Sequence, residues 1–261
     1  MSLRVAVQMD PLESIKISGD STFAIMLKAQ ELGLKLYHYL TEDLTYNDGR
    51  LYAGAHEVSV QAVAGDHFRR GDFAILDLGK DVDVVLMRQD PPFDLGYITA
   101  THLLERIQNE TLVVNDPAAV RNAPEKVWVL DFARFMPPTM LTRSLGASRH
   151  FLAEHGDCVL KPLHGSAGKA VFKIGRDGAN LAAGGTAEAA ELTDTEREIC
   201  EGLKPELKRR GLLFVGIDVI GGRWLTEINV TSPTGIVAVD KFNGTDTPGL
   251  IWQAIERKLK D

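Results

Sequence analysis

Residues 211–235 hold two short runs of β-branched and apolar residues, and the dipeptide Gly221-Gly222 lies between them. Two such runs joined by a two-residue glycine turn predict a β-hairpin. We expect its strands over residues 212–220 and 223–230. Because the turn and the alternation of side chains fix the register of a hairpin, we take the rest of the chain to be organised around this stretch.

Three oxygen-bearing side chains occur in this hairpin: Asp218, Glu227 and Asn229. Side chains alternate between the faces of a strand, so Glu227 and Asn229, two residues apart, share one face. Two carboxylates and a carboxamide suit a hard divalent cation, Mg²⁺ or in its place Mn²⁺, which takes its remaining ligands from water and phosphate. The alternative is that the two carboxylates only interact across an exposed hairpin face, since polar positions are common there.

Two runs in this hairpin, residues 216–220 (GIDVI) and residues 225–235 (LTEINVTSPTG), resemble the metal-binding end of bacterial glutathione synthetases. Those enzymes are members of the ATP-grasp superfamily of carboxylate–amine ligases. A match of this length, with all three oxygen donors in place, is more specific than a short motif.

The resemblance implies a role for each polar residue of the hairpin. Asp218, Glu227 and Asn229 would hold the magnesium ions that bridge the ATP phosphates, and Asn229 would also contact ATP. Ser232 and Thr234, in the turn that follows, would face the peptide substrate.

Residues 1–122 predict an N-terminal α/β domain with a mostly parallel sheet. Apolar strands are expected over residues 3–9, 35–41, 82–87 and 112–115, and helices over residues 21–32 and 97–108. Ligands of such folds lie beyond the carboxyl ends of parallel strands, so the loop over residues 10–20 is a candidate site wall. Its Lys16 is either a solvated lysine or, as a similar basic loop in the resembling family implies, a substrate-side residue.

The segment Arg88 to Asp94 (RQDPPFD) follows the strand at residues 82–87. Its two prolines remove conformational freedom from a loop just past a strand end, which is where functional residues are often found. An Arg88–Asp90 ion pair could simply tie the loop down. The segment also resembles a family signature on the peptide-substrate side, which implies that Arg88 and Asp90 bind substrate. The two N–H groups of an arginine guanidinium can donate side by side to the two oxygens of a substrate carboxylate.

The central region, residues 123–178, contains a second group of candidate ATP ligands. Lys126 reads as a surface lysine on its own, but the resemblance places it on an ATP phosphate. Lys161 opens the glycine-rich segment KPLHGSAGK, whose backbone could approach phosphates. The segment lacks the Walker A spacing and resembles the phosphate lid of ATP-grasp ligases, which implies that Lys161, Gly165 and Gly168 contact nucleotide. His164 and the following Ser-Ala depart from the family pattern.

A larger departure follows the lid. Residues 179–261 form the expected C-terminal lobe with the metal site, and they begin with a segment that resembles a glycine-rich substrate loop containing Asn180. By the resemblance, a segment on the order of fifty residues that clamps adenine is missing before it, and lids of this kind are often mobile. Either the protein is truncated and inactive, or the sequence omits a mobile lid, and we prefer omission.

Composition excludes several classes of function. With a net charge of −7 and a pI near 5.5, the chain lacks the basic character expected of a nucleic-acid surface. The start MSLRVAVQMD does not resemble a signal peptide, and no segment approaches the roughly 20 apolar residues of a membrane span. Cys158 and Cys200 are too few for a disulfide framework. We expect a cytoplasmic protein that binds neither nucleic acid nor membrane, and the resemblance implies a homo-oligomer.

The resemblance implies an ATP-dependent ligase that joins γ-glutamylcysteine to glycine and releases ADP and phosphate. A carboxylate is a poor electrophile, so ATP would first convert it to an acyl phosphate, which the glycine amine then attacks. We expect no nucleophilic or basic catalytic residue, since positioning and charge neutralisation suffice. The alternatives are an ATP-grasp ligase for another amino acid or peptide, and an inactive peptide-binding remnant without the ATP clamp.

Overall fold

The computed structural model describes residues 2–164, 171–175 and 188–260, and the backbone of residues 180–182. The N-terminal part is built on a seven-stranded sheet with the order β3-β4-β2-β1-β6-β7, in which β5 also pairs with β4. Its strands are β1 (Arg4–Gln8), β2 (Lys35–Tyr39), β3 (Leu44–Asn47), β4 (Arg50–Val60), β5 (Phe68–Asp77), β6 (Val84–Met87) and β7 (Leu112–Val114).

The sheet has a parallel half and an antiparallel half. β2, β1, β6 and β7 pair in parallel, as the sequence predicts for the N-terminal α/β domain. β3, β4 and β5 add antiparallel pairings at one edge, which the prediction of a mostly parallel sheet did not include. Asp48 and Gly49 both have positive φ, as a tight hairpin between β3 and β4 needs.

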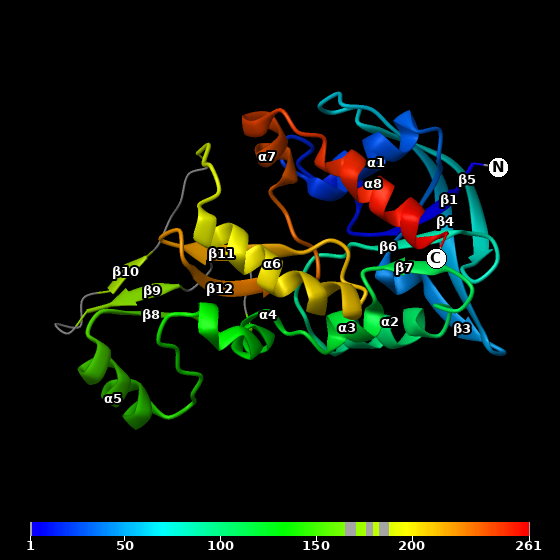
Figure 1. Ribbon diagram of the computed structural model, residues 1–261. Coiled ribbons are helices and arrows are strands. Elements are labelled where there is room, and N and C mark those ends of the chain that lie inside the picture. The colour runs from blue at the N-terminus through cyan, green and yellow to red at the C-terminus, as the bar shows by residue number, and fades with distance from the viewer. Residues whose placement is uncertain (1, 165–170, 176–179, 183–187, 261) are drawn as a thin grey trace.

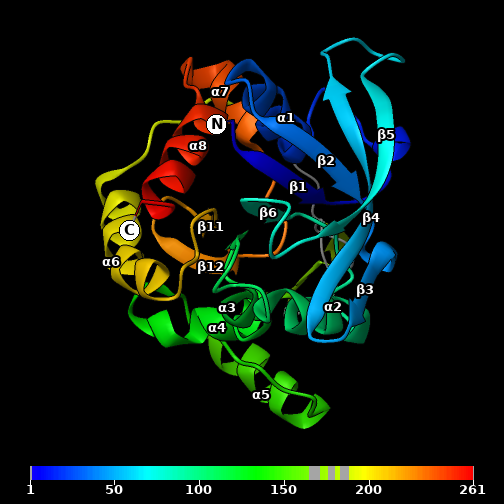
Figure 2. The same ribbon diagram turned by 90° about the vertical axis from the view of Figure 1, so that its right-hand side faces the viewer.

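Helices cover both faces of the parallel strands, as Figures 1 and 2 show. One face carries α1 (Ser21–Glu31), α7 (Ile236–Asn243) and α8 (Thr247–Lys258), and the other carries α2 (Leu95–Glu105) and α3 (Pro117–Arg121). Alternate residues of β1 enter the two cores: Val5 and Val7 pack on the α1 side, and Ala6 on the α2 side. The buried strands are therefore apolar on both faces, as expected of parallel strands between helices.

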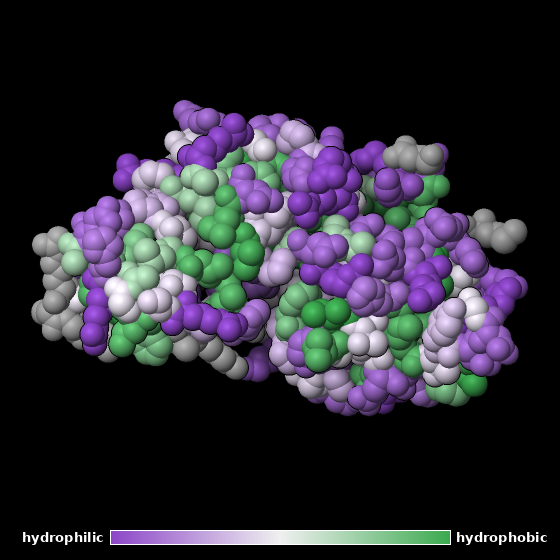
Figure 3. Space-filling view, turned by 90° about the horizontal axis from the view of Figure 1, so that it is seen from below, coloured by the Kyte–Doolittle hydropathy of each residue, from purple (hydrophilic) through white to green (hydrophobic). Residues whose placement is uncertain are grey.

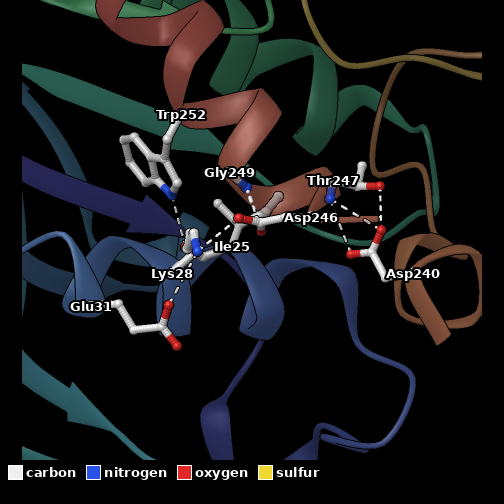
Figure 4. A network of polar contacts seen from close by, with 8 residues as sticks. All are labelled: Ile25, Lys28, Glu31, Asp240, Asp246, Thr247, Gly249 and Trp252. Carbon is white, nitrogen blue, oxygen red and sulfur yellow. Dashed lines mark hydrogen bonds and ion pairs between the residues drawn. The ribbon is translucent and has the colours of Figure 1, made fainter. Parts of the chain in front are cut away.

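The C-terminal helix α8 returns to the N-terminal sheet and packs on α1 (Figure 4). The indole Nε1 of Trp252 donates to the Ile25 carbonyl at 2.9 Å, and Lys28 pairs with Asp246 at 2.7 Å. Ile251 and Ile255 of α8 are buried in this contact. Leu250 of the same helix is 58% exposed, because Trp252 occupies the inward position.

The central hairpin forms a separate two-stranded sheet of β11 (Gly216–Ile220) and β12 (Trp224–Asn229). Its turn is confirmed, because Gly221 and Gly222 have φ of 61° and 68°. Against it lie α6 (Asp194–Arg209), α4 (Glu125–Trp128) and the 3-10 segment η3 (Val129–Phe135), whose apolar side chains share its core. The predicted start of the first strand at residue 212 was too early, because the backbone N–H groups of Leu213 and Phe214 bond a side chain outside the hairpin.

A small lobe projects from the molecule at the end opposite β3 and β5 (Figure 1). It comprises α5 (Leu145–His155), β8 (Cys158–Leu160), β9 (Phe172–Ile174) and β10 (Asn180–Ala182), with the strands in the order β10-β9-β8. Among the described residues from 137 to 198, Gly156 alone is buried. Val159, Leu160 and Phe172 are exposed, and Figure 3 shows apolar surface on this lobe. The lobe thus has no core of its own in the described part of the chain.

In the N-terminal part, short 3-10 turns lie at η1 (Leu12–Ser14) and η2 (Thr41–Asp43).

Candidate active site

The three oxygen donors of the hairpin lie together, as the sequence predicts. Asp218 of β11 is the direct cross-strand partner of Glu227 of β12, and Gly216 is that of Asn229. Directly opposed residues of an antiparallel pair point to the same face, so both carboxylates project from one side. The register shifts between Asp218 and Val219, so a bulge follows the first carboxylate.

Two lysines from distant parts of the chain reach Glu227. The Nζ of Lys161, just past β8, donates to Oε1 at 2.8 Å, and the Nζ of Lys126, in α4, lies 3.9 Å from Oε2. The reading of Lys126 as a surface lysine is wrong, because its side chain is only 13% exposed. Each oxygen of one carboxylate therefore faces an ammonium group, and the two predicted ATP lysines and the predicted metal ligands form one cluster.

The electrostatics of this cluster suit a cation. Asp218 is an exposed residue of the hairpin. Enough protein nevertheless surrounds its carboxyl that loss of water, followed by the charge of Glu227, raises its pKa. Burial, and then Glu227, likewise raise the pKa of Glu125. A divalent cation would relieve this repulsion, and two carboxylates with the Asn229 amide are the hard oxygen donors that such a cation prefers. Among the described residues, no group of three or more His, Cys, Asp or Glu side chains is placed to hold a metal ion by itself.

Arg88 occupies a second, buried site beyond the carboxyl end of β6. Its side chain is not paired with Asp90 in the described part of the chain. Instead Nε donates to Thr22 Oγ1 at 2.9 Å and Nη2 donates to the Pro233 carbonyl at 2.8 Å. The guanidinium also lies over the ring of Phe214, 5.0 Å from its centroid. Burial lowers the pKa of Arg88 to about 10, so it remains a cation at neutral pH.

Other predicted substrate residues gather around Arg88. Ser232 Oγ donates to the Arg88 carbonyl at 3.3 Å, and the Asp90 N–H donates to the carboxylate of Asp10 at 2.8 Å. Thr231 Oγ1 lies 3.4 Å from Glu125 Oε1, so the substrate turn connects this site to the lysine cluster. The two predicted groups of residues are thus neighbours.

The structure does not bring every predicted residue to this place. The side chains of Lys16 and Thr234 are exposed, and neither has a side-chain hydrogen bond to another described residue. Asn180 lies in β10, where only the backbone is described, and Gly165 and Gly168 lie outside the described residues.

Sequence reasoning missed two residues that hold the site together. Thr22 bonds Arg88, and Asn115 bonds four backbone groups at 2.7 to 2.9 Å, in Leu213, Phe214 and Val230. Neither residue carries a local signal, since Thr22 opens an ordinary helix and Asn115 ends an ordinary strand.

An α/β sheet domain is followed by a hairpin whose carboxylates meet two lysines of the central region, and this arrangement fits the class of ATP-grasp proteins. The solved structure of D-cycloserine synthetase shares this fold, with a TM-score of 0.63 and 16% identity over 98% of this chain and 99% of that one. Residues 3–121 match the prokaryotic glutathione synthetase N-terminal domain, and residues 125–181 and 175–244 match the ATP-grasp domain of the same family. The chain belongs to the prokaryotic glutathione synthetase family, which confirms the resemblance.

Bacterial relatives match along nearly their whole length. Glutathione synthetase of Agrobacterium fabrum is 43% identical, with 97% of this chain and 96% of that protein covered. Glutathione synthetase of Rhodopseudomonas palustris is 45% identical, with 99% of both covered. In the described residues no helix is long and apolar enough to cross a membrane.

The relatives contain a segment that this chain lacks. The alignment with the Rhodopseudomonas palustris protein spans 313 positions, so at least 52 of them face no residue of this 261-residue chain. The two ATP-grasp matches overlap at residues 175–181, which follow β9 and include the start of β10. Ile174 of β9 pairs directly with Asn180 of β10, and only five residues of the sequence lie between them.

Proposed function

We propose that this protein is an ATP-dependent ligase that joins γ-glutamylcysteine to glycine to form glutathione, with release of ADP and phosphate. The observation that carries the proposal is the convergence of Lys126 and Lys161 on Glu227, beside Asp218 and Asn229. Cations for phosphate and hard oxygens for a divalent metal meet there in one place. The substrates are those that the names of the full-length relatives imply.

In this proposal Asp218, Glu227 and Asn229 hold Mg²⁺, or Mn²⁺ in its place. The metal would neutralise phosphate charge while the phosphoryl group moves to the dipeptide carboxylate. Lys126 and Lys161 would bind phosphate oxygens of ATP, as would the backbone at Gly165 and Gly168. The acyl phosphate is then attacked by the glycine amine, and phosphate leaves. No residue of the chain forms a covalent bond, because positioning and charge neutralisation carry the reaction.

The dipeptide would lie against the Arg88 site. A buried cation with no carboxylate partner in the described part of the chain is suited to a substrate carboxylate. Asp90 and Ser232 lie beside it, and Lys16, Asn180 and Thr234 would complete the substrate contacts from surrounding loops. These assignments rest on the family resemblance and on the position of Arg88 next to the turn at Pro233.

The same proposal divides the chain into residues 1–122, 123–178 and 179–261: a substrate domain, a shortened central lobe and a C-terminal lobe with the metal site. It also makes the protein a cytoplasmic homo-oligomer that binds small molecules and neither nucleic acid nor membrane. The net charge of −7 supports the exclusion of nucleic acid, and the family resemblance supports the rest.

The test is phosphate release by the purified 28.6 kDa chain, whose intact mass is measured first. We expect release that requires ATP, γ-glutamylcysteine, glycine and Mg²⁺ together, with glutathione detected by mass spectrometry, and we expect Asp218→Asn to abolish it. Turnover with a different acceptor amino acid would instead indicate a ligase of other specificity.

The lobe without a core and the missing segment favour a second candidate, a peptide-binding remnant. A chain of 28.6 kDa that binds γ-glutamylcysteine but shows no turnover would support that candidate and refute the ligase.

A further inference from the structure

Charges of opposite sign alternate through the site. Glu125 lies 3.7 Å from Lys126, Lys126 lies 3.9 Å from Glu227, and Lys161 donates to Glu227 at 2.8 Å. Asp218 faces Glu227 across the hairpin. The groups assigned to metal and the groups assigned to phosphate are therefore in direct contact and neutralise one another.

Lys161 also connects two parts of the molecule. It follows β8 of the projecting lobe, whereas Glu227 belongs to β12. Between described residues of the lobe and of the hairpin, Lys161 to Glu227 is the one side-chain hydrogen bond. Both side chains are mostly buried, at 25% and 14% exposure, so solvent screens the pair less than it would screen a surface pair.

We infer that Lys161, together with Lys126, occupies the place of the metal cation at Glu227 until ligands bind. Metal and nucleotide therefore bind with positive coupling, and Lys161 determines the size of that coupling. This inference rests on the proposed function only in taking the ligands to be a divalent metal and a nucleotide. A metal ion that arrives alone meets a carboxylate whose two oxygens face ammonium groups. It must displace Lys161 and then stand beside its uncompensated charge.

A nucleotide that arrives alone meets the converse problem. Its phosphates can attract Lys161 and Lys126 away from Glu227, but they leave Glu227 and Asp218 as bare carboxylates beside a polyanion. When both ligands bind, the lysines transfer to the phosphates and the metal takes their place at Glu227, so every charge keeps a partner. Such coupling is reciprocal: each ligand raises the affinity for the other by the same factor.

The experiment measures binding of Mn²⁺ to the full chain, by electron paramagnetic resonance of the free ion, with and without ADP. A titration of ADP without protein gives the Mn²⁺ that ADP alone removes, and this amount is subtracted. The variants are Lys161→Met and, as a matched control, Lys173→Met. Lys173 lies on β9 of the same lobe, is 54% exposed and pairs with Asp157, so its removal deletes one positive charge without touching Glu227. Circular dichroism checks that each variant folds.

For the wild-type chain we expect ADP to raise the Mn²⁺ affinity about tenfold or more, within the usual range of coupling between sites. Lys161→Met should bind Mn²⁺ alone more tightly than wild type and gain little from ADP, whereas Lys173→Met should behave as wild type. Adding Asp218→Asn to Lys161→Met should abolish the tighter binding, which would place the ion at the hairpin.

Three results would each overturn the inference: equal Mn²⁺ affinity of the wild-type chain with and without ADP, no gain in Mn²⁺ affinity on Lys161→Met, or a gain that survives Asp218→Asn. These readouts do not depend on turnover. A chain that is inactive but shows the coupling loses the ligase proposal and keeps this one. An active chain without the coupling does the reverse.

Discussion

The side chain of Asn115 joins the N-terminal sheet to the hairpin that carries the candidate metal site. It is 4% exposed at the end of β7. Its Nδ2 donates to the carbonyls of Phe214 and Val230 at 2.7 and 2.9 Å, and its Oδ1 accepts from the N–H groups of Leu213 and Phe214 at 2.9 Å each. These groups flank β11 and β12, so one amide holds both ends of the hairpin.

Asn115→Ala removes four hydrogen bonds and leaves four backbone groups without this partner. At about 1 kcal/mol net for each bond, the free energy of unfolding should fall by roughly 3–4 kcal/mol. For a chain of this size that corresponds to a fall in Tm of roughly 10 °C. Asn115→Asp should be at least as destabilising, because its second carboxylate oxygen would face two carbonyl oxygens. Urea unfolding followed by circular dichroism measures both variants.

Asn109→Ala is the matched control, since Asn109 is exposed and its side chain forms no hydrogen bond with a described residue. It should leave the free energy of unfolding within about 0.5 kcal/mol of wild type. If Asn115→Ala stayed within about 1 kcal/mol of wild type, the assignment of Asn115 as the connection between sheet and hairpin would be refuted.

Three further predictions concern the second site, the pH dependence of stability and the C-terminal helix. Arg88→Lys loses the two guanidinium hydrogen bonds to Thr22 and Pro233. The affinity for γ-glutamylcysteine, measured by calorimetry, should therefore fall at least about tenfold while Mn²⁺ binding is unchanged. An unchanged dipeptide affinity would contradict the substrate role of Arg88. Burial lowers the pKa of His38, so below about pH 6.5 the unfolded chain binds more protons than the folded one. Stability should therefore fall as the pH drops from 7 through that range, and urea titrations should show a smaller fall for His38→Gln; an equal fall would exclude His38 as the cause. Trp252→Ala should cost about 3–5 kcal/mol in urea unfolding, against less than about 0.5 for exposed Leu250→Ala, and similar values for both would contradict the packing of α8 on α1.

Local signals in the sequence predicted the elements of the site well. The Gly221-Gly222 turn identified the hairpin because only residues that tolerate positive φ allow so tight a connection. Alternation along paired strands then brought Asp218 and Glu227 to one face. Thr193 and Glu196, three residues apart, form the reciprocal pair of bonds of a capping box at the start of α6, a pattern that the sequence contains. In each case the interaction lies within a few residues, so the sequence pattern contains it.

Contacts between distant segments could not be predicted in this way. The partner of Arg88 in the turn at Pro233 is 145 residues away, and the local alternative, Asp90, was the wrong one. The approach of Lys161 to Glu227 depends on how the projecting lobe is placed on the hairpin. The edge strands β3 and β5 were missed because an antiparallel addition to a parallel sheet leaves only a weak alternation in an exposed strand.

The projecting lobe gives a last prediction, on the segment that the relatives contain. Leu160 of β8 and its cross-strand partner Phe172 of β9 are 52% and 40% exposed, so the described residues leave this face of the three-stranded sheet without a covering layer. A sheet of this size needs a packed face for independent stability. The two ATP-grasp matches overlap between the end of β9 and the start of β10. We therefore expect the additional segment of the relatives to leave the sheet there, next to these side chains.

Inserting the Rhodopseudomonas palustris segment between β9 and β10 should therefore bury that apolar surface and order the lobe. We expect slower amide hydrogen exchange in β8 and ADP affinity at least about tenfold higher than in the present chain, because a lobe that is already ordered binds without the entropy cost of becoming so. A Gly-Ser linker of equal length is the control and should change neither quantity. If the inserted segment left the exchange rates of β8 unchanged, that segment would not pack on the exposed face of the sheet. If it slowed exchange without raising ADP affinity, the nucleotide would be held by the lysine cluster alone, since Lys126 and Lys161 are present in both chains.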